Sequence, residues 1–171
     1  MASLMENIVE VLEKENTEYQ SLIKLSEEKS PVIIKGDLPN LNRITEAEQI
    51  IVARIQKLEK ERMQTMKDIA EVTNYKADIK LGDLIEMMGK HPSEQARLRD
   101  LHDRLKATMG RMKQVNEQNR DLLRNSLEMV QFEMNLLQSL KTAPETADYN
   151  SSAYSTGTIM GSGTKRFDAK Q

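Results

Sequence analysis

Apolar residues along this chain recur at alternating spacings of three and four, a pattern typical of long helices that pack on one another. In the first segment the pattern runs from Met5 to Ile33, and it predicts a helix near residues 3–35. Ser3 and Glu6 have the spacing of a capping box, which predicts that this helix begins behind Ser3. Gly36 with the following Asp-Leu-Pro predicts a turn and a second helix close behind the first, so the two should form a helical hairpin.

The same spacing predicts two further long helices, near residues 38–74 and 92–141. It is strictest in the last of them, from Leu98 to Leu140. At about 1.5 Å per residue this helix would be about 75 Å long against about 50 Å for each of the others, so it should extend beyond its partners. A short apolar cluster predicts a short helix around residues 81–89 in the connection.

These elements predict an all-α fold, an antiparallel bundle of three long helices plus one short helix in the connection, with coiled-coil-like packing. We expect residues 1–141 to form the bundle domain. Residues 142–171 are dominated by Ser, Thr, Gly and Ala without periodicity, so we expect a disordered tail. Residues 1–35 carry a net charge of -3 and residues 92–141 one of +2, which favours packing of the first long helix against the last.

The composition argues against an enzyme. There is no cysteine, so disulfides, thiolate zinc sites and cysteine nucleophiles are excluded. The residues three positions before His91 and His102 are Met88 and Arg99, so the Glu-x-x-His motif of di-metal bundles is absent. No acid and base residues form a recognisable catalytic pair. We therefore expect no enzymatic activity, no cofactor and no metal.

Charge and hydropathy restrict the partners. A net charge of -2 gives no electrostatic case for nucleic acid. No apolar run approaches the about 20 residues that a membrane span needs, and residues 1–14 lack the features of a signal peptide. We expect a cytoplasmic protein whose partners are other proteins.

The apolar surface at the end of the last helix is the most informative feature, because it occupies more than the single stripe that a two-helix seam requires. This surface is either core or oligomer seam, or a site for a partner helix, to which flexible methionines are suited. Asn119 and Ser126 lie on the seam itself, where polar groups either set the register of the bundle or bind an incoming helix. The candidate partner-binding residues are Asn119, Leu122, Leu123, Ser126, Met129, Val130, Phe132, Leu136 and Leu137.

Several short motifs, in this order and spacing, resemble the FlgN-type flagellar export chaperones of bacteria. The motifs are Glu15-Asn16-Thr17-Glu18-Tyr19, Ile34-Lys35-Gly36-Asp37-Leu38, Leu58-Glu59-Lys60-Glu61-Arg62 and Asn116-Glu117-Gln118-Asn119-Arg120-Asp121-Leu122-Leu123. The resemblance implies a chaperone that binds the C-terminal helices of the hook-filament junction proteins FlgK and FlgL, prevents their premature polymerisation and delivers them to the flagellar type III export gate. It also implies that the C-terminal part of the chaperone holds the client.

The tail shares a further feature with the family, a tyrosine among small residues that is associated with docking to the export gate protein FlhA. Tyr149 occupies this position, and Tyr154 is an alternative because Ala153 stands where the family usually has glycine. Two other interpretations stay open: a chaperone for another secreted or phage-tail protein, and a structural coiled-coil dimerisation protein without a client. The pattern is compatible with a monomer or a homodimer.

Overall fold

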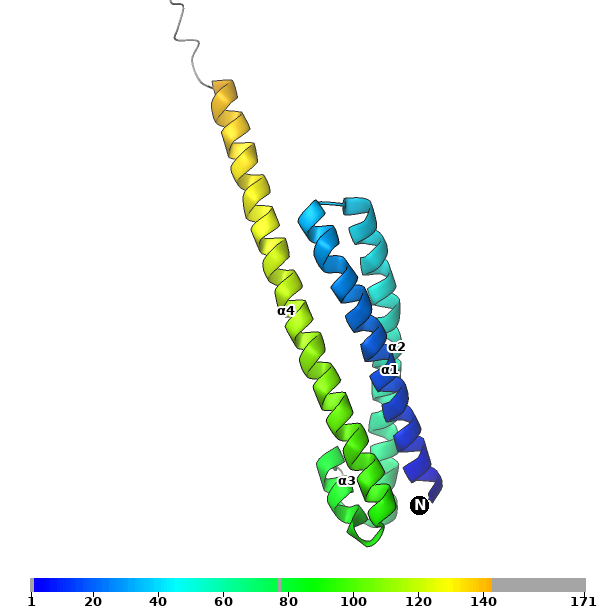
Figure 1. Cartoon of the computed structure of the whole chain (residues 1–171). Coiled ribbons are helices and arrows are strands. Elements are labelled where there is room, and N and C mark those ends of the chain that lie inside the picture. Colours follow the sequence, from blue (N-terminus) through cyan, green and yellow to red (C-terminus); the bar gives the residue numbers. More distant parts are fainter. Residues whose placement is uncertain (1, 77, 143–171) are drawn as a thin grey trace, which may run out of the picture. The chain divides into compact units, whose positions relative to one another are not determined.

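The computed structural model describes residues 2–76 and 78–142, with the side chains of residues 2, 3 and 142 left out of the description. Its elements are α1 (Ala2–Lys35), α2 (Leu38–Thr73), α3 (Leu81–Met87), the 3-10 helix η1 (Met88–Lys90) and α4 (Pro92–Thr142) (Figure 1). No strand occurs among these residues. The predicted all-α fold of three long helices and a short one in the connection is therefore confirmed.

The expected capping box at the start of the chain is wrong. Helix α1 already includes Ala2, so Ser3 lies inside the helix rather than in front of it. A helix start needs a residue outside the helix whose side chain accepts from the first amides, and Ser3 does not have that position.

The chain divides into two compact units, Met1–Phe132 and Glu133–Gln171, which we describe separately. The first unit contains α1, α2, α3, η1 and α4 as far as Phe132. The second contains the last turns of α4, and residues 143–171 lie outside the part of the chain that the structure describes. The division into a bundle of residues 1–141 and a tail of residues 142–171 stays a prediction.

The turn between α1 and α2 has the features expected from its sequence. Gly36 has a φ of 66°, in the left-handed region that glycine adopts without strain. Asp37 then caps α2: its carboxylate accepts from the backbone N–H of Asn40 at 3.2 Å and from the Asn40 side chain at 2.6 Å. These hydrogen bonds hold the pKa of Asp37 below its ordinary value. The hairpin therefore ends in a fixed turn.

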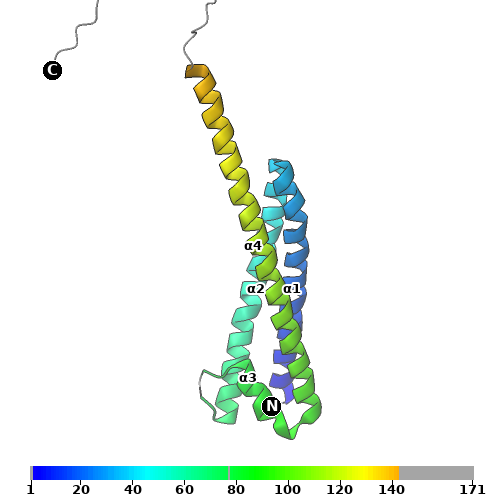
Figure 2. The same ribbon diagram turned by 60° about the vertical axis from the view of Figure 1, so that its left-hand side comes forward.

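Helix α4 runs parallel to α1, because partners on the two helices advance in the same direction (Figure 2). Arg97 pairs with Glu13 at 3.3 Å, and Arg111 pairs with Glu27 at 2.7 Å. The two ion pairs join the acidic first helix to the basic last helix, as the charge distribution predicts. Both pairs are exposed, so they add little stability and serve mainly to orient the helices.

Buried apolar side chains form two clusters inside the first unit. The larger one joins α1, α2, the short helices and the beginning of α4: Met5, Ile8, Val9, Leu12, Met66, Ile69, Ala70, Ile79, Leu84, Ile85, Met88, Leu98, Leu101 and Leu105. The smaller one, nearer to the hairpin turn, consists of Leu22, Ile51, Ile55 and Met112. Tyr19 packs against both clusters. Their burial is the main stabilising contribution to the bundle.

Polar residues interrupt the seam of α1 between Leu12 and Leu22, and each finds a partner on a neighbouring helix. Glu15, whose side chain is 4% exposed, pairs with Arg62 of α2 at 3.1 Å. Asn16 accepts from the hydroxyl of Thr108 of α4 at 2.8 Å. Burial raises the pKa of Glu15, and the nearby Arg62 offsets only part of this effect. The polar residues that interrupt the heptad pattern at this level thus form a polar layer inside the bundle.

None of the helices in the described part of the chain combines the length and the apolar character that crossing a membrane requires.

The raised pKa of Glu15 gives the stability of the bundle an unusual pH dependence. The folded chain binds a proton at Glu15 more readily than the unfolded chain, so the stabilisation is present below the unfolded pKa and is lost as the pH rises through the folded pKa. Relative to a Glu15→Gln variant, the wild-type chain should therefore have a larger free energy of unfolding at about pH 4 than at about pH 7. Denaturant unfolding of both chains, followed by circular dichroism across this range, measures the difference. The prediction is contradicted if the free energy of unfolding of the wild-type chain, relative to that of the variant, increases as the pH rises toward 7.

Candidate partner-binding site

Burial along α4 changes at Asn119. The seam residues before this point, Leu98, Leu101, Leu105, Met112 and Val115, are all buried. Asn119, 5% exposed, is the last buried residue among the described side chains of α4. Leu122, Leu123 and Ser126 are half-buried, and every described residue after Ser126 is exposed. Within one continuous helix, a covered segment is followed by an uncovered one.

The uncovered segment of α4 is rich in large apolar side chains. In the first unit the exposed ones are Leu127 (70%), Met129 (64%), Val130 (52%) and Phe132 (68%). In the second unit they are Met134 (50%), Leu136 (50%), Leu137 (59%) and Leu140 (66%). Scattered apolar residues on a surface need no explanation, but a concentration of them on one helix marks an interaction site.

The exposed residues continue the seam that is buried earlier in the helix. Leu122 and Met129, both in the first unit, follow Val115 at intervals of seven residues, so by helical spacing they lie on the same side of α4 as that buried valine. Ser126 follows Asn119 at the same interval. The apolar face of α4 is therefore a bundle seam without a partner helix.

The predicted partner-binding set, which stays a prediction, includes five of these exposed apolar residues, Met129, Val130, Phe132, Leu136 and Leu137, and lacks Leu127, Met134 and Leu140. Leu127 is the most exposed large apolar residue of the described chain, and it is missing from the predicted set. It lies off the three-and-four spacing, so the spacing gave no signal for it. Tyr149 and Tyr154, the predicted docking residues, lie outside the described residues.

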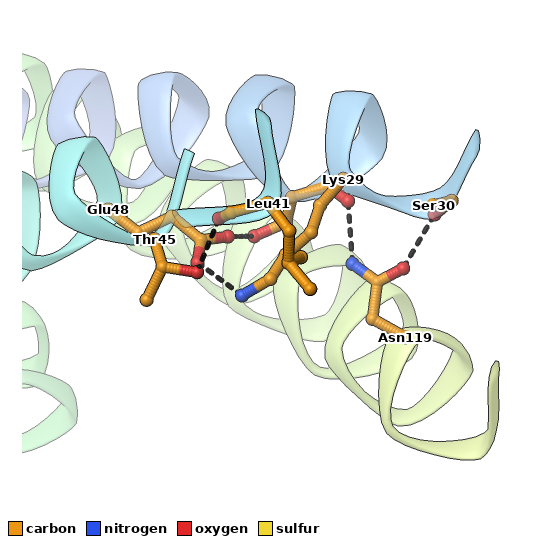
Figure 3. A network of polar contacts seen from close by, with 7 residues as sticks. Lys29, Ser30, Leu41, Thr45, Glu48 and Asn119 are labelled. Atoms are coloured by element: carbon orange, nitrogen blue, oxygen red, sulfur yellow. Dashed lines mark hydrogen bonds and ion pairs between the residues drawn. The ribbon is translucent and has the colours of Figure 1, made fainter. Parts of the chain in front are cut away.

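Asn119, also in the predicted set, belongs to a network of hydrogen bonds inside the bundle (Figure 3). Its side-chain amide donates to the backbone carbonyl of Ser26 at 2.6 Å and accepts from the hydroxyl of Ser30 at 2.6 Å. The hydroxyl of Ser26 donates to Glu48 of α2 at 2.7 Å, and Lys29 binds the other oxygen of the same carboxylate at 2.7 Å. The network thus joins α1, α2 and α4 at one level.

This network lies just before a proline in α1. Pro31 has no N–H, so the carbonyl of Glu27 lacks its helical donor, and α1 is weakened at this turn. Asn119 connects α4 to the neighbouring residues Ser26 and Ser30. No buried side-chain nitrogen or oxygen in the described residues lacks a partner, and the amide of Asn119 is engaged on both sides. Of the two interpretations of Asn119, the contacts favour the register of the bundle, and we leave it out of the partner surface.

Each of the two histidines lies near one acidic side chain. Nδ1 of His91 lies 3.6 Å from Glu94, and Nδ1 of His102 lies 3.1 Å from Asp103. Across the described ranges, no group of three or more His, Cys, Asp or Glu side chains is arranged to hold a metal ion. The site that the structure offers is apolar and suited to binding.

The chain is thus a bundle of long helices whose last helix carries exposed apolar residues. Residues 1–155 match the family described as FlgN protein, and the chain therefore belongs to the FlgN family and is a flagellar export chaperone. The resemblance seen in the sequence motifs is thereby confirmed. Proteins of this family are not known as enzymes.

A curated relative from Bacillus subtilis (strain 168), described as uncharacterized protein YvyG, is 28% identical over 130 residues. The match covers 76% of this chain and 78% of the relative. No solved structure matches the chain significantly.

Replacing Asn119 by alanine should destabilise the bundle. The hydroxyl of Ser30 and the carbonyl of Ser26 would lose a hydrogen-bond partner in a buried place, which costs about 1–3 kcal/mol in the free energy of unfolding. Asn116→Ala is the matched control, because Asn116 is exposed on the same helix one turn earlier. Denaturant unfolding of the three chains measures the cost. Equal stability of the two variants would show that the network does not hold α4 in place.

Proposed function

We propose that this chain binds the C-terminal helices of the hook-filament junction proteins FlgK and FlgL in the cytoplasm, prevents their premature polymerisation and delivers them to the flagellar export gate. Membership of the FlgN family supports a chaperone of flagellar export. The observation that carries the proposal is the exposed apolar seam of α4. Such a seam needs a helix to cover it, and an amphipathic client helix is the occupant that a chaperone would supply.

The residues proposed to contact the client lie along α4 after Asn119. They are Leu122, Leu123, Ser126, Met129, Val130, Phe132, Leu136 and Leu137, and we add Leu127 because of its exposure. Covering them removes apolar surface from water, worth about 25 cal/mol for each Å². The flexible side chain of Met129 can adjust to different client sequences, which suits a chaperone with two clients.

The chaperone acts by covering a surface, without chemistry. A junction protein whose terminal helix lies on α4 cannot use the same apolar face for polymerisation. Neither a nucleotide nor a metal is needed for such capping, and release follows when the export machinery binds the client. Delivery uses the tail: we propose that Tyr149, or Tyr154 in its place, docks to the gate protein FlhA.

Charges placed in the seam should abolish client binding. A double variant Val130→Asp, Leu137→Asp buries two carboxylates under the client helix, each at a cost of several kcal/mol, so affinity should fall by at least about 100-fold. Isothermal titration with a C-terminal peptide of FlgK or FlgL measures the affinity, and circular dichroism checks that helicity is kept.

The control for this variant carries the same two charges elsewhere. Ile50 and Val72 of α2 are 57% and 59% exposed, so Ile50→Asp, Val72→Asp adds the same charge to a similarly exposed apolar surface. It should bind the peptide like the wild-type chain. If the seam variant stays folded and binds as tightly as the control, the client site lies elsewhere.

Removing the tail should separate client binding from delivery. Residues 143–171 contain few large apolar side chains to offset the entropy of ordering them, so truncation after Thr142 should leave the melting temperature and client affinity nearly unchanged. Binding of the client-loaded chaperone to the soluble domain of FlhA should be lost. One of the two single variants, Tyr149→Ala or Tyr154→Ala, should reproduce this loss and so identify the docking residue, because an aromatic anchor often dominates a short docking motif. Unchanged FlhA binding by the truncated chain would refute the docking role.

A further inference from the structure

The exposed Ile34 at the end of α1 is not explained by the bundle. Asn16, Glu27 and Ser30 contact α4 through Thr108, Arg111 and Asn119. Ile34 follows Asn16 by 18 residues, which is five helical turns, and Ser30 by four, so it lies on the side of α1 that faces α4. It is nevertheless 69% exposed, whereas its neighbour Ile33 is 4% exposed. Ile34 is therefore an apolar residue that α4 leaves uncovered in the last turn of α1.

Helix α4 shows the same change on its own side. After Asn119 its seam residues Leu122, Leu123 and Ser126 are half-buried, and Val130 is 52% exposed. In Figures 1 and 2, the yellow-green part of α4 separates from the light-blue end of α1 in both views. All of these residues belong to the first unit. Beyond the Asn119 network, exposed apolar residues thus occur on both helices, Ile34 on α1 and Met129 and Val130 on α4.

The chemistry of these exposed residues favours a helix as the partner that covers them. Of the residues named above, Ile34, Leu122, Leu123 and Val130 are apolar and only Ser126 is polar, so an extended peptide could not satisfy its backbone on them, whereas a helix satisfies its own. The small side chain of Ser126 would also let a helix approach closely.

We propose that the client helix enters between α4 and the end of α1 and packs against Ile34, so that the hairpin turn forms a second wall of the client site. This inference rests on the proposed function and specifies the geometry of the same site. The turn is held by Gly36 and by the cap at Asp37, so the second wall is formed before the client arrives. Because this turn is already ordered, the client helix gains apolar contact with it without an entropy cost for ordering the chaperone.

The test compares two isoleucines that differ in position. Ile34→Gln removes the proposed contact, and Ile50→Gln is the matched control, because Ile50 is 57% exposed on α2. Titration with a C-terminal peptide of FlgK or FlgL should show about tenfold weaker binding for Ile34→Gln and wild-type affinity for the control. Unfolding of both variants checks that neither loses stability. Wild-type affinity of Ile34→Gln would overturn the inference.

A second measurement reports contact directly. The chain has no cysteine, so Ile34→Cys and Ile50→Cys each offer a unique site for an environment-sensitive fluorophore. Adding the peptide should shift the emission to the blue at position 34 and leave position 50 unchanged. No shift at position 34 would overturn the inference. If the emission at position 34 shifts when the chaperone is concentrated in the absence of peptide, a second copy of this chain covers Ile34. This outcome would also overturn the inference.

The outcomes separate this inference from the proposed function. If the wild-type chain does not bind the peptide, the proposed function fails. If the wild-type chain binds and the charged seam variant does not, while Ile34→Gln binds normally, the client lies on α4 alone and only the second wall is refuted.

Discussion

The buried contact of Asn119 with the end of α1 is the interaction on which the rest of this structure depends. It fixes the level at which α4 stays attached to the hairpin, because the amide binds both a backbone carbonyl and a hydroxyl of α1. Before this level the apolar seam of α4 is buried, and after it the seam is first half-buried and then, beyond Ser126, exposed. A polar contact can hold one level of a bundle without requiring further apolar contact beyond it. The bundle and the candidate site therefore meet at one residue.

Two polar layers divide the bundle into short apolar sections. Glu15 with Arg62 lies between the two apolar clusters, and the Asn119 network follows the second cluster. Each layer weakens the hydrophobic contribution but admits only one register of the helices, because a shift would leave buried polar groups without partners. A chaperone that presents an apolar helix benefits from such a fixed base.

Much of the candidate site could be predicted from the sequence. The heptad spacing from Leu98 to Leu140 and the excess of apolar residues after Leu122 indicated a surface in need of a partner. The spacing gave no signal for Leu127, since this residue lies off the seam. It also left open whether Asn119 faced the bundle or a partner. That question depends on Ser26 and Ser30, which lie about 90 residues away in the sequence.

The sequence by itself determined the helices, their order, the hairpin turn and the family, because spacing, turn residues and short motifs are local properties. It did not determine where α4 leaves the hairpin. Ile34 lies, by helical spacing, on the side of α1 that faces α4 and is exposed, while Asn119 is polar and buried. Only the tertiary structure decided these two cases, since the burial of a side chain depends on whether another helix lies opposite it, and no local pattern records the distance between helices.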